Sequence, residues 1–286
     1  MKNLFTRSLF VGFLIAFVFS SCQQDSEPAL DPSVAIELSD LAYGMAERQK
    51  MDVYLPANRS QDRTKVLIWI HGGAWIDGDK AEFRDFKPLF ESVQEDYAYI
   101  AINYRLFNLL GNVNRFPAQE EDVKAAINFI KSKLREWNLS DKVVLAGASA
   151  GGHLALLHSY KNDDNLVDVC VALFPPTDLI MLAQTNAFAG ILFNSMIGDI
   201  NTQQQLYINS SPLNFITNNS VPTAFFHGTA DTVVPVSQSQ ELERVLGENN
   251  VPKLVQYFPG KGHGFSDQTY VALLRDTETF IRQHLP

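Results

Sequence analysis

The stretch Lys142–Ala146, followed by Gly147-Ala148-Ser149-Ala150-Gly151-Gly152 and then by His153–Tyr160, decides the fold of this chain. Its first part is rich in valine and leucine and predicts a strand, and its last part can continue as a helix. Small residues two before and two after the serine permit a sharp, strained turn that exposes the serine side chain. By itself the pattern also suits a glycine-rich turn before a helix, but a strand, Gly-x-Ser-x-Gly and a helix together predict that Ser149 is a nucleophile.

Outward from this turn, short apolar runs alternate with amphipathic stretches, which is typical of a mostly parallel sheet with helices on both faces. The predicted strands are an edge strand near Val34–Tyr43, then Met51–Leu55, Val66–Ile70, Tyr97–Asn103, Lys142–Ala146, Asp168–Phe174, Thr223–His227 and Lys253–Phe258. The predicted helices are Phe83–Gln94, Pro117–Trp137 with Pro117 in its first turn, Ala150–Tyr160, Ser237–Glu248 and Tyr270–His284. We therefore expect an α/β fold with a sheet of about eight strands.

Between Pro175 and Val221 the alternation of strands and helices lapses. A connection of this length inside a compact domain usually has a function, so we expect a small cap inserted at about residues 177–220. Its apolar residues, which include Phe188 and Phe193, are spaced as on a short helix. They either pack the insertion onto the core or line an acyl or aromatic pocket, for which Trp75, Phe188 and Phe193 are the candidates.

A serine hydroxyl is a poor nucleophile at neutral pH and needs a base, which an acid must in turn orient. Asp231 follows the predicted strand Thr223–His227, and His263 follows the next predicted strand. The order Ser149, Asp231, His263 is the chain order of an α/β-hydrolase triad. Each residue alone could be an ordinary loop or turn residue, and Asp178 is an alternative acid because it too follows a predicted strand. The three together predict a catalytic triad.

The negative oxygen that forms when a serine attacks a carbonyl needs hydrogen-bond donors already in place. The backbone N–H of Ala150, directly after the nucleophile, is one expected donor. The segment His71-Gly72-Gly73-Ala74-Trp75 follows another predicted strand and supplies the second, for which Gly73 and Ala74 are the candidates. The glycines of this segment also suit a purely structural turn.

These motifs resemble the α/β-hydrolase esterase/lipase superfamily whose members carry a His-Gly-Gly segment, and the resemblance covers nearly all of residues 43–284. Besides the triad, it extends to Asp52-Val53-Tyr54-Leu55-Pro56, Asn103-Tyr104-Arg105-Leu106 and Phe116-Pro117-Ala118-Gln119-Glu120-Glu121-Asp122. Within the superfamily the chain is most similar to secreted bacterial carbohydrate esterases that remove acetyl or feruloyl groups. Gly-Ala-Ser-Ala-Gly replaces the Gly-Asp-Ser-Ala-Gly common in hormone-sensitive-lipase relatives, which counts against a lipid substrate.

The resemblance implies a serine carboxylesterase that hydrolyses short-chain acyl or feruloyl esters, on a small molecule or a polysaccharide, through an acyl-enzyme. Similar segments occur in arylformamidases and in peptidase-type domains, so an amide substrate is the alternative. A surface glycan-binding protein that merely retains the scaffold is an alternative of another class. We expect no cofactor and no metal, because His71, His153, His158, His227, His263 and His284 show no ligand spacing. We expect His71 and His227 to position backbone near the site.

The N-terminus reads as an export signal over residues 1–22. Lys2 and Arg7 precede the apolar run Leu9–Phe19, which reaches only about half of a bilayer core of roughly 30 Å. Ser20-Ser21-Cys22 resembles a bacterial lipoprotein signal, with Cys22 lipidated as the mature N-terminus, and an ordinary secretory peptide cut near Ser21 is the alternative. Residues 23–33 read as a flexible tether and 34–286 as the hydrolase domain. We expect an exported protein anchored by lipid to a bacterial envelope membrane.

The composition excludes some partners. Apolar residues make up 46% of the chain, which is enough for one large core, and the formal net charge is −9. Loss of Lys2 and Arg7 with the leader makes the mature chain more negative still, which disfavours binding to nucleic acid. Cys170 lies in an apolar run and is expected to be part of the core. The sequence leaves the oligomeric state open.

Overall fold

The computed structural model describes residues 30–161 and 165–285. The predicted leader 1–22, with Cys22, and most of the tether 23–33 lie outside the described residues. Among the residues that are described, no helix combines the length and the apolar composition needed to cross a bilayer.

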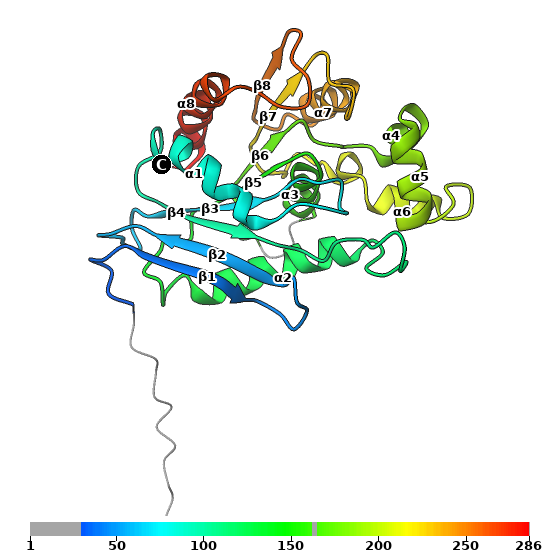
Figure 1. Cartoon of the computed structure of the whole chain (residues 1–286). Helices are drawn as coiled ribbons and strands as arrows, with labels where there is room; N and C mark the ends of the chain where they lie inside the picture. Colours follow the sequence, from blue (N-terminus) through cyan, green and yellow to red (C-terminus); the bar gives the residue numbers. More distant parts are fainter. Residues whose placement is uncertain (1–29, 162–164, 286) are drawn as a thin grey trace, which may run out of the picture.

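An eight-stranded sheet runs through the molecule in the order β1-β2-β4-β3-β5-β6-β7-β8 (Figure 1). The strands β1 and β2 pair antiparallel, as do β2 and β4, and every other neighbouring pair is parallel. The bounds are β1 Ile36–Ala42, β2 Lys50–Leu55, β3 Lys65–Ile70, β4 Tyr97–Ile102, β5 Val143–Ala148, β6 Val169–Leu173, β7 Thr223–Gly228 and β8 Lys253–Phe258. The parallel strands end at a common edge, which brings the loops after β3, β5, β7 and β8 together.

Helices cover both faces of the sheet. One face packs against α1 (Phe83–Glu91, preceded by the 3₁₀ turn η1, Lys80–Glu82) and α8 (Asp267–His284). The other face packs against α2 (Ala118–Lys133), α3 (Ala150–Tyr160) and α7 (Ser237–Glu248). This arrangement follows from the central strands β3 to β7, which are apolar along nearly their whole length and therefore need cover on both sides.

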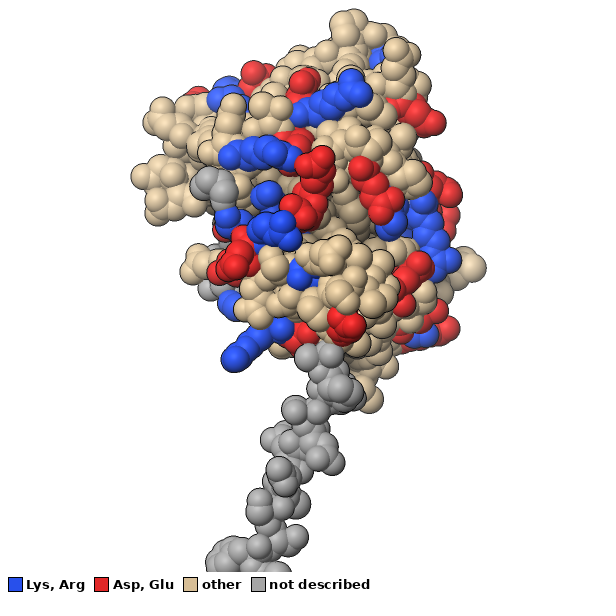
Figure 2. Space-filling view, turned by 90° about the vertical axis from the view of Figure 1, so that its left-hand side faces the viewer, with Lys and Arg blue, Asp and Glu red and all other residues tan. Residues whose placement is uncertain are grey.

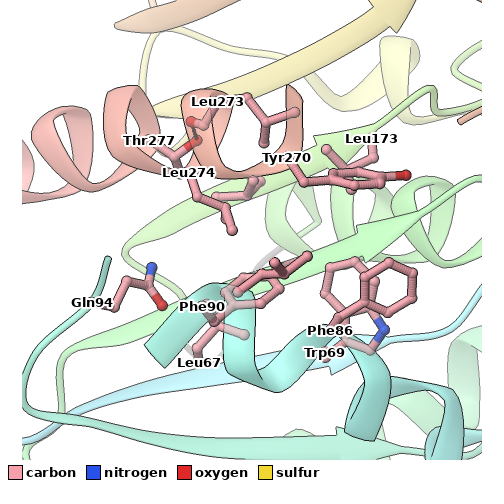
Figure 3. A pocket seen from close by; sticks show the side chains of 13 residues that line it. Leu67, Trp69, Phe86, Phe90, Gln94, Leu173, Tyr270, Leu273, Leu274 and Thr277 are labelled. Atoms are coloured by element: carbon pink, nitrogen blue, oxygen red, sulfur yellow. Dashed lines mark hydrogen bonds between the residues drawn. The ribbon is translucent and has the colours of Figure 1, made fainter. Parts of the chain in front are cut away.

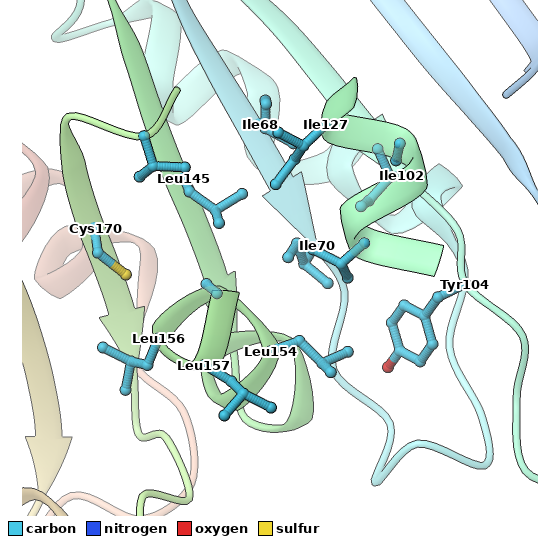
Figure 4. Close-up of a cluster of buried hydrophobic side chains, with 14 of the residues drawn as sticks. Ile68, Ile70, Ile102, Tyr104, Ile127, Leu145, Leu154, Leu156, Leu157 and Cys170 are labelled. Atoms are coloured by element: carbon cyan, nitrogen blue, oxygen red, sulfur yellow. The ribbon is translucent and has the colours of Figure 1, made fainter. Parts of the chain in front are cut away.

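Successive side chains of a strand point to opposite faces, and the core divides accordingly. On β3, Ile68 and Ile70 belong to the cluster under α2 and α3, which Figure 4 shows, whereas Leu67 and Trp69 belong to the cluster under α1 and α8. Cys170 lies fully buried in the first cluster, and its burial raises the pKa of the thiol to about 12.

Three helices differ in their bounds from the sequence-based prediction. The predicted helix Phe83–Gln94 is α1 and ends at Glu91. The predicted helix Pro117–Trp137 is α2, Ala118–Lys133, and Pro117 precedes its first residue rather than lying in its first turn. At the other end the chain leaves the helix at Leu134, and Trp137 turns into the core, where it is almost fully buried. The last helix begins at Asp267, before the predicted start at Tyr270, because Ser266 adopts the extended conformation of a residue that precedes a helix.

The segment between β6 and β7 is helical. It contains α4 (Leu179–Thr185), α5 (Ala187–Met196), α6 (Gln204–Asn209) and the 3₁₀ turn η2 (Pro212–Phe215). Figure 1 shows α4, α5 and α6 grouped at one side of the molecule, next to the end of the sheet where β5 passes into α3. The insertion therefore lies beside the loops at the carboxyl edge of the strands.

Charged side chains of both signs are interspersed on the face shown in Figure 2. Lys87 pairs with Glu91 along α1, and Arg84 of α1 pairs with Glu37 of β1. The face in that view therefore offers no patch of a single sign.

Candidate active site

Ser149 lies at the sharp turn between β5 and α3, with φ 54° and ψ −121°, a strained conformation for a residue with a side chain. The glycines of the motif allow the turn. A Cβ atom on Gly151 would lie 2.1 Å from the Ile70 carbonyl oxygen, and one on Gly147 would lie 2.4 Å from the Gly151 carbonyl oxygen. The neighbouring backbone therefore fits only glycine at both positions, and the turn holds Ser149 at the sheet's edge.

The structure brings Ser149, Asp231 and His263 together from three separate loops. His263 Nε2 lies 2.9 Å from Ser149 Oγ, and His263 Nδ1 lies 2.6 Å from Asp231 Oδ2. Since a carboxylate can only accept, Nδ1 carries the proton and Nε2 is free to accept the proton of the serine hydroxyl. This is the arrangement of a nucleophile, a general base and an orienting acid.

The Asp231 carboxylate is held by the backbone as well as by His263. Its Oδ1 accepts from the N–H groups of Val233 and Val234, at 2.8 and 2.9 Å. Burial alone would raise the pKa of Asp231, but the hydrogen bonds from His227, His263 and Val234 outweigh burial and hold that pKa well below its usual range. Asp231 is therefore ionised at neutral pH.

His227 fixes the loop that carries Asp231. Its Nε2 donates to the Val234 carbonyl at 2.8 Å and lies 3.3 Å from Asp231 Oδ2, and its Nδ1 accepts from the Ser239 hydroxyl at 2.7 Å. The ring is completely buried. His227 thus positions backbone next to the acid.

The loop after β3 carries three successive residues with positive φ: Gly73 at 98°, Ala74 at 50° and Trp75 at 61°. A Cβ atom on Gly73 would lie 2.1 Å from the Asp77 carbonyl oxygen. Gly73 and Ala74 line the same cleft as Ser149. Ala150 is the first residue of α3, where the backbone N–H has no partner within the helix. These are the positions at which the sequence predicts donors for the oxyanion.

Gly73→Ala is expected to lower kcat by about 10² to 10³, the cost of losing one oxyanion donor, and to change KM little. The added methyl group would push the loop away from Asp77 and tilt the N–H groups of Gly73 and Ala74. Steady-state kinetics of Gly73→Ala and the wild type measures both kcat and KM. Gly260→Ala, where nothing lies within 4 Å of the added Cβ and φ is also positive, is the matched control and should lose far less kcat.

His71 supports the base of this loop. Its Nδ1 donates to the Gly72 carbonyl at 2.7 Å, and its ring stacks on Tyr104 with the centroids 4.4 Å apart. The Tyr104 hydroxyl lies within hydrogen-bond distance of the same Gly72 carbonyl. Burial lowers the pKa of His71 to about 4.

His153 joins the loop to the insertion. Its Nε2 donates to the Ser210 carbonyl at 2.7 Å, and its Nδ1 accepts from the Trp75 indole N–H at 3.3 Å. Complete burial lowers the pKa of His153 to about 4. His153 lies one turn after Ser149, so it connects the helix that follows the nucleophile with the loop after β3 and with the insertion.

Acid should destabilise the fold through these two histidines. Their pKa values fall from 6.5 when unfolded to about 4 when folded. Between these two pKa values both histidines are therefore mainly protonated in the unfolded chain and mainly neutral in the folded chain. The free energy of unfolding should fall as the pH drops from 6.5 towards 4, by up to about 3 kcal/mol for each histidine.

Urea unfolding above and below pH 6.5 measures this loss. In His153→Gln the amide can make both hydrogen bonds without titrating, so the loss should be about half that of the wild type. A variant that loses as much stability in acid as the wild type would contradict the assignment to His153.

A cleft of about 470 Å³ opens above Ser149. Aromatic side chains form one wall: Trp69 from β3, Phe86 from α1 and Tyr270 from α8. Phe174, which follows β6 with φ 39°, packs its ring 4.5 Å from the His263 ring. Ile76, Leu173 and Val233 complete the apolar part of the lining. An acyl group next to Ser149 would therefore meet mainly apolar and aromatic surface.

The predicted pocket residues Trp75, Phe188 and Phe193 do not line this cleft. Trp75 is 3% exposed because its loop turns the indole inward to His153, and Phe193 is fully buried against Trp75 with the ring centroids 5.5 Å apart. Phe188 is 59% exposed on the outer surface of α5. The prediction for these three residues is wrong, since two of them pack the insertion onto the core.

Asp178, the alternative acid, has a different role. It precedes α4, and its carboxylate accepts from the N–H groups of Ile180 and Met181 at 2.9 and 3.0 Å. It is therefore a helix cap. The sequence-based reasoning missed Trp69, Phe86, Phe174 and Tyr270, whose only sequence signal is their position near predicted strand or helix ends.

Comparison with known proteins finds a family match and similar esterases. The chain matches the family model described as BD-FAE over residues 51–246. Esterase LipC of Mycobacterium tuberculosis is 26% identical over 241 residues, which are 78% of this chain and 58% of LipC. The chain spans only about half the length of the curated relatives that it matches first, from 50% to 58%.

Solved structures share the fold. A truncated carbohydrate esterase from gut microbiota superposes with a TM-score of 0.75 at 24% identity, covering 89% of this chain and 98% of that one. A bifunctional GH43-CE of Bacteroides eggerthii gives a TM-score of 0.73 at 26% identity, covering 91% of this chain and 39% of that one. The predicted α/β-hydrolase fold is confirmed.

Proposed function

The chain belongs to the BD-FAE family of α/β-hydrolases, and from that premise we propose that it is a serine carboxylesterase that works through an acyl-enzyme. One observation carries the proposal: the chain of hydrogen bonds from Ser149 through His263 to Asp231 at the floor of an open cleft. The match to the family model and the similarity to esterases support the same reaction class.

Each residue of the site has its own role in the proposed reaction. His263 Nε2 takes the proton of the Ser149 hydroxyl while its oxygen attacks the ester carbonyl, and Asp231 stabilises the imidazolium that forms. In this proposal the backbone N–H of Ala150 and that of Gly73 or Ala74 donate to the carbonyl oxygen as it becomes negative. His263 then gives the proton to the departing alcohol. Water repeats these steps on the acyl-enzyme and releases the acid.

For the substrate we propose short-chain acyl or feruloyl esters carried by carbohydrates. The aromatic wall of Trp69, Phe86 and Tyr270 suits an apolar or planar acyl group, because aromatic rings pack favourably against one another. The cleft is open, so a large alcohol can remain outside it. The relatives described as a carbohydrate esterase and as GH43-CE support a carbohydrate alcohol.

A substrate panel tests the reaction class. Residues 23–286 should hydrolyse 4-nitrophenyl acetate, acetylated xylan and methyl ferulate unequally, and should hydrolyse 4-nitroacetanilide far more slowly than the acetate ester. Faster hydrolysis of the anilide would favour an amide hydrolase. Binding of xylan without hydrolysis of any ester would favour a non-catalytic glycan-binding protein.

We also propose that the protein is exported and anchored by lipid at Cys22, on the strength of the apolar run and the small residues before the cysteine. Several acyl chains are needed for stable anchoring, since one gives only marginal membrane binding. Expression in a bacterium with a lipoprotein-processing pathway tests this. The full-length chain should partition into the detergent phase, and Cys22→Ala should not; equal partitioning of both would contradict the anchor.

A further inference from the structure

The loop after β3 keeps its shape only if its surroundings hold it. Ala74 and Trp75 are not glycines, yet their φ angles are 50° and 61°, a costly conformation that persists where neighbouring groups fix it. The start of the loop is fixed by β3, because Trp69 packs against Phe86 of α1 with the ring centroids 6.1 Å apart (Figure 3). The end of the loop, at Gly78, needs a support of its own.

Arg48 binds this end of the loop. It lies between β1 and β2, and its Nη2 donates to the Gly78 carbonyl at 2.7 Å. Its Nε donates to the Tyr104 carbonyl at 3.0 Å, and its Nη1 lies 3.6 Å from Asp79 Oδ2. One guanidinium therefore joins the segment after β1, the loop after β3 and the segment after β4.

The two ends of the loop lie against each other beside Arg48. A Cβ atom on Gly78 would lie 2.4 Å from His71 Nδ1 and 2.7 Å from the Gly72 carbonyl oxygen. Arg48 Nη2 lies 3.5 Å from His71 Nε2, which is able to accept because Nδ1 of that ring carries the proton. Since the N–H groups of a guanidinium have fixed directions, Arg48 fixes both ends of the loop relative to each other.

The candidate oxyanion donors lie between these two ends. The N–H groups of Ile76 and Asp77 both donate to the Gly73 carbonyl, at 3.0 and 2.9 Å. This tight turn leads directly into Gly78. A displacement of Gly78 would therefore also displace the N–H groups of Gly73 and Ala74.

We propose that Arg48 is a positioning residue for the oxyanion hole. Its bonds to the Gly78 and Tyr104 carbonyls keep the N–H groups of the loop after β3 directed at the oxyanion. Arg48 is not among the residues that line the catalytic cleft, so it acts through the loop and not on the reacting atoms. The inference rests on the proposed esterase function.

A direct contact between Arg48 and the substrate is the alternative, since the side chain is 29% exposed and lines an open groove. Its donors are directed at the protein, however: Nε and Nη2 at the groups described above, and Nη1 at the Asp79 carboxylate. The two roles differ in kinetics. Loss of a substrate contact raises KM, whereas loss of a positioned oxyanion donor lowers kcat.

Arg48→Met tests the proposal, because it keeps the length of the side chain and removes every donor. With 4-nitrophenyl acetate it should lower kcat by about 10- to 100-fold, less than the loss of a whole oxyanion donor, and change KM by less than about 2-fold. Arg48→Lys keeps the charge beside Asp79 and should fold in any case. Its single ammonium cannot replace the planar fork, so kcat should fall to an intermediate value.

A thionoester distinguishes a defect of the oxyanion hole from a general loss of structure. Sulfur accepts hydrogen bonds weakly, so O-(4-nitrophenyl) thioacetate gains little from the oxyanion donors, whereas 4-nitrophenyl acetate gains much. The ratio of kcat/KM for the ester to kcat/KM for the thionoester should fall about 10-fold in Arg48→Met, and at least as far in Gly73→Ala.

A double-mutant cycle tests whether Arg48 acts through the loop. If it does, Arg48→Met should lower kcat much less in the Gly73→Ala background than in the wild type, because both changes disturb the same donors. The double variant should therefore lose about as much kcat as Gly73→Ala alone.

Arg59→Met is the matched control. Arg59 is 3% exposed and likewise donates to backbone carbonyls, those of Trp137, Val34 and Leu30, at 2.7, 2.8 and 3.1 Å. These carbonyls precede β1 and β5, so Arg59 lies at the edge of the sheet opposite the candidate site. Arg59→Met should lower the free energy of unfolding in urea, but leave kcat and the ester-to-thionoester ratio within about 2-fold of the wild type.

Wild-type kcat with an unchanged ester-to-thionoester ratio in Arg48→Met and Arg48→Lys would overturn the inference. A rise in KM at constant kcat, additive losses in the double variant, or an equal fall of the ratio in Arg59→Met would overturn it as well. Failure of the wild type to hydrolyse 4-nitrophenyl acetate is a separate result, which would contradict the esterase function itself.

Discussion

Ser149→Ala is expected to lower kcat/KM for 4-nitrophenyl acetate by up to about 10⁶, as loss of a serine nucleophile does in other hydrolases. The hydroxyl that His263 deprotonates would be absent, so no acyl-enzyme could form. The rest of the site should be undisturbed, because the strained turn depends on Gly147 and Gly151 and the Ser149 side chain donates to nothing but His263 among the described residues.

The control measurement for Ser149→Ala is its stability. Urea unfolding of Ser149→Ala should give a free energy of unfolding equal to or slightly above that of the wild type, since the half-buried hydroxyl that is lost faces the open cleft and leaves no internal cavity. Equal kcat/KM in both proteins would show that hydrolysis does not use Ser149. A large loss of stability would instead assign the loss of activity to the fold.

Asp231→Asn should lower kcat by about 10⁴, the size of the effect when a triad acid is replaced by its amide. The asparagine Oδ1 can still accept from Val233 and Val234, so the loop should keep its shape. The amide nitrogen, however, would donate to His263 Nδ1. The proton of the ring would then lie on Nε2, which could no longer accept the proton of Ser149.

Asp178→Asn is the matched control for this substitution. Asparagine caps a helix about as well as aspartate, so α4 should remain intact and kcat should change by less than about 2-fold. Steady-state kinetics of the two variants distinguishes the acids. A greater loss in Asp178→Asn than in Asp231→Asn would contradict the assignment of the triad acid.

Sequence reasoning predicted the parts of the site that local rules determine. The turn around Ser149 is such a part, since glycines at 147 and 151 are needed wherever backbone approaches this closely. The chain order predicted that Asp231 and His263 lie on loops near Ser149, and the structure brings the three side chains within hydrogen-bond distance because parallel strands bring those loops together. The central strands β3 to β7 were predictable because buried strands are short apolar runs.

The pocket was not predictable, because it depends on which way a side chain turns after the backbone is set. Trp75 and Trp69 are equally apolar in the sequence, yet the positive φ of Trp75 directs it to His153, while Trp69 follows the strand alternation and lines the cleft. The predicted end of α2 at Trp137 was wrong for a similar reason, since the helix ends at Lys133. Trp137 continues the apolar pattern of the helix, but the chain turns before it so that the ring can enter the core.

The central claim is that Ser149 carries the acyl group during turnover, and mass spectrometry of the trapped intermediate tests it most directly. The enzyme is mixed with 4-nitrophenyl acetate, quenched in acid within the first turnover and digested. The account predicts an acetyl group on the peptide that contains Ser149, at Ser149 itself, and none in Ser149→Ala. An acetyl group on another residue, or hydrolysis with no covalent acetyl-enzyme in any sample, would contradict it.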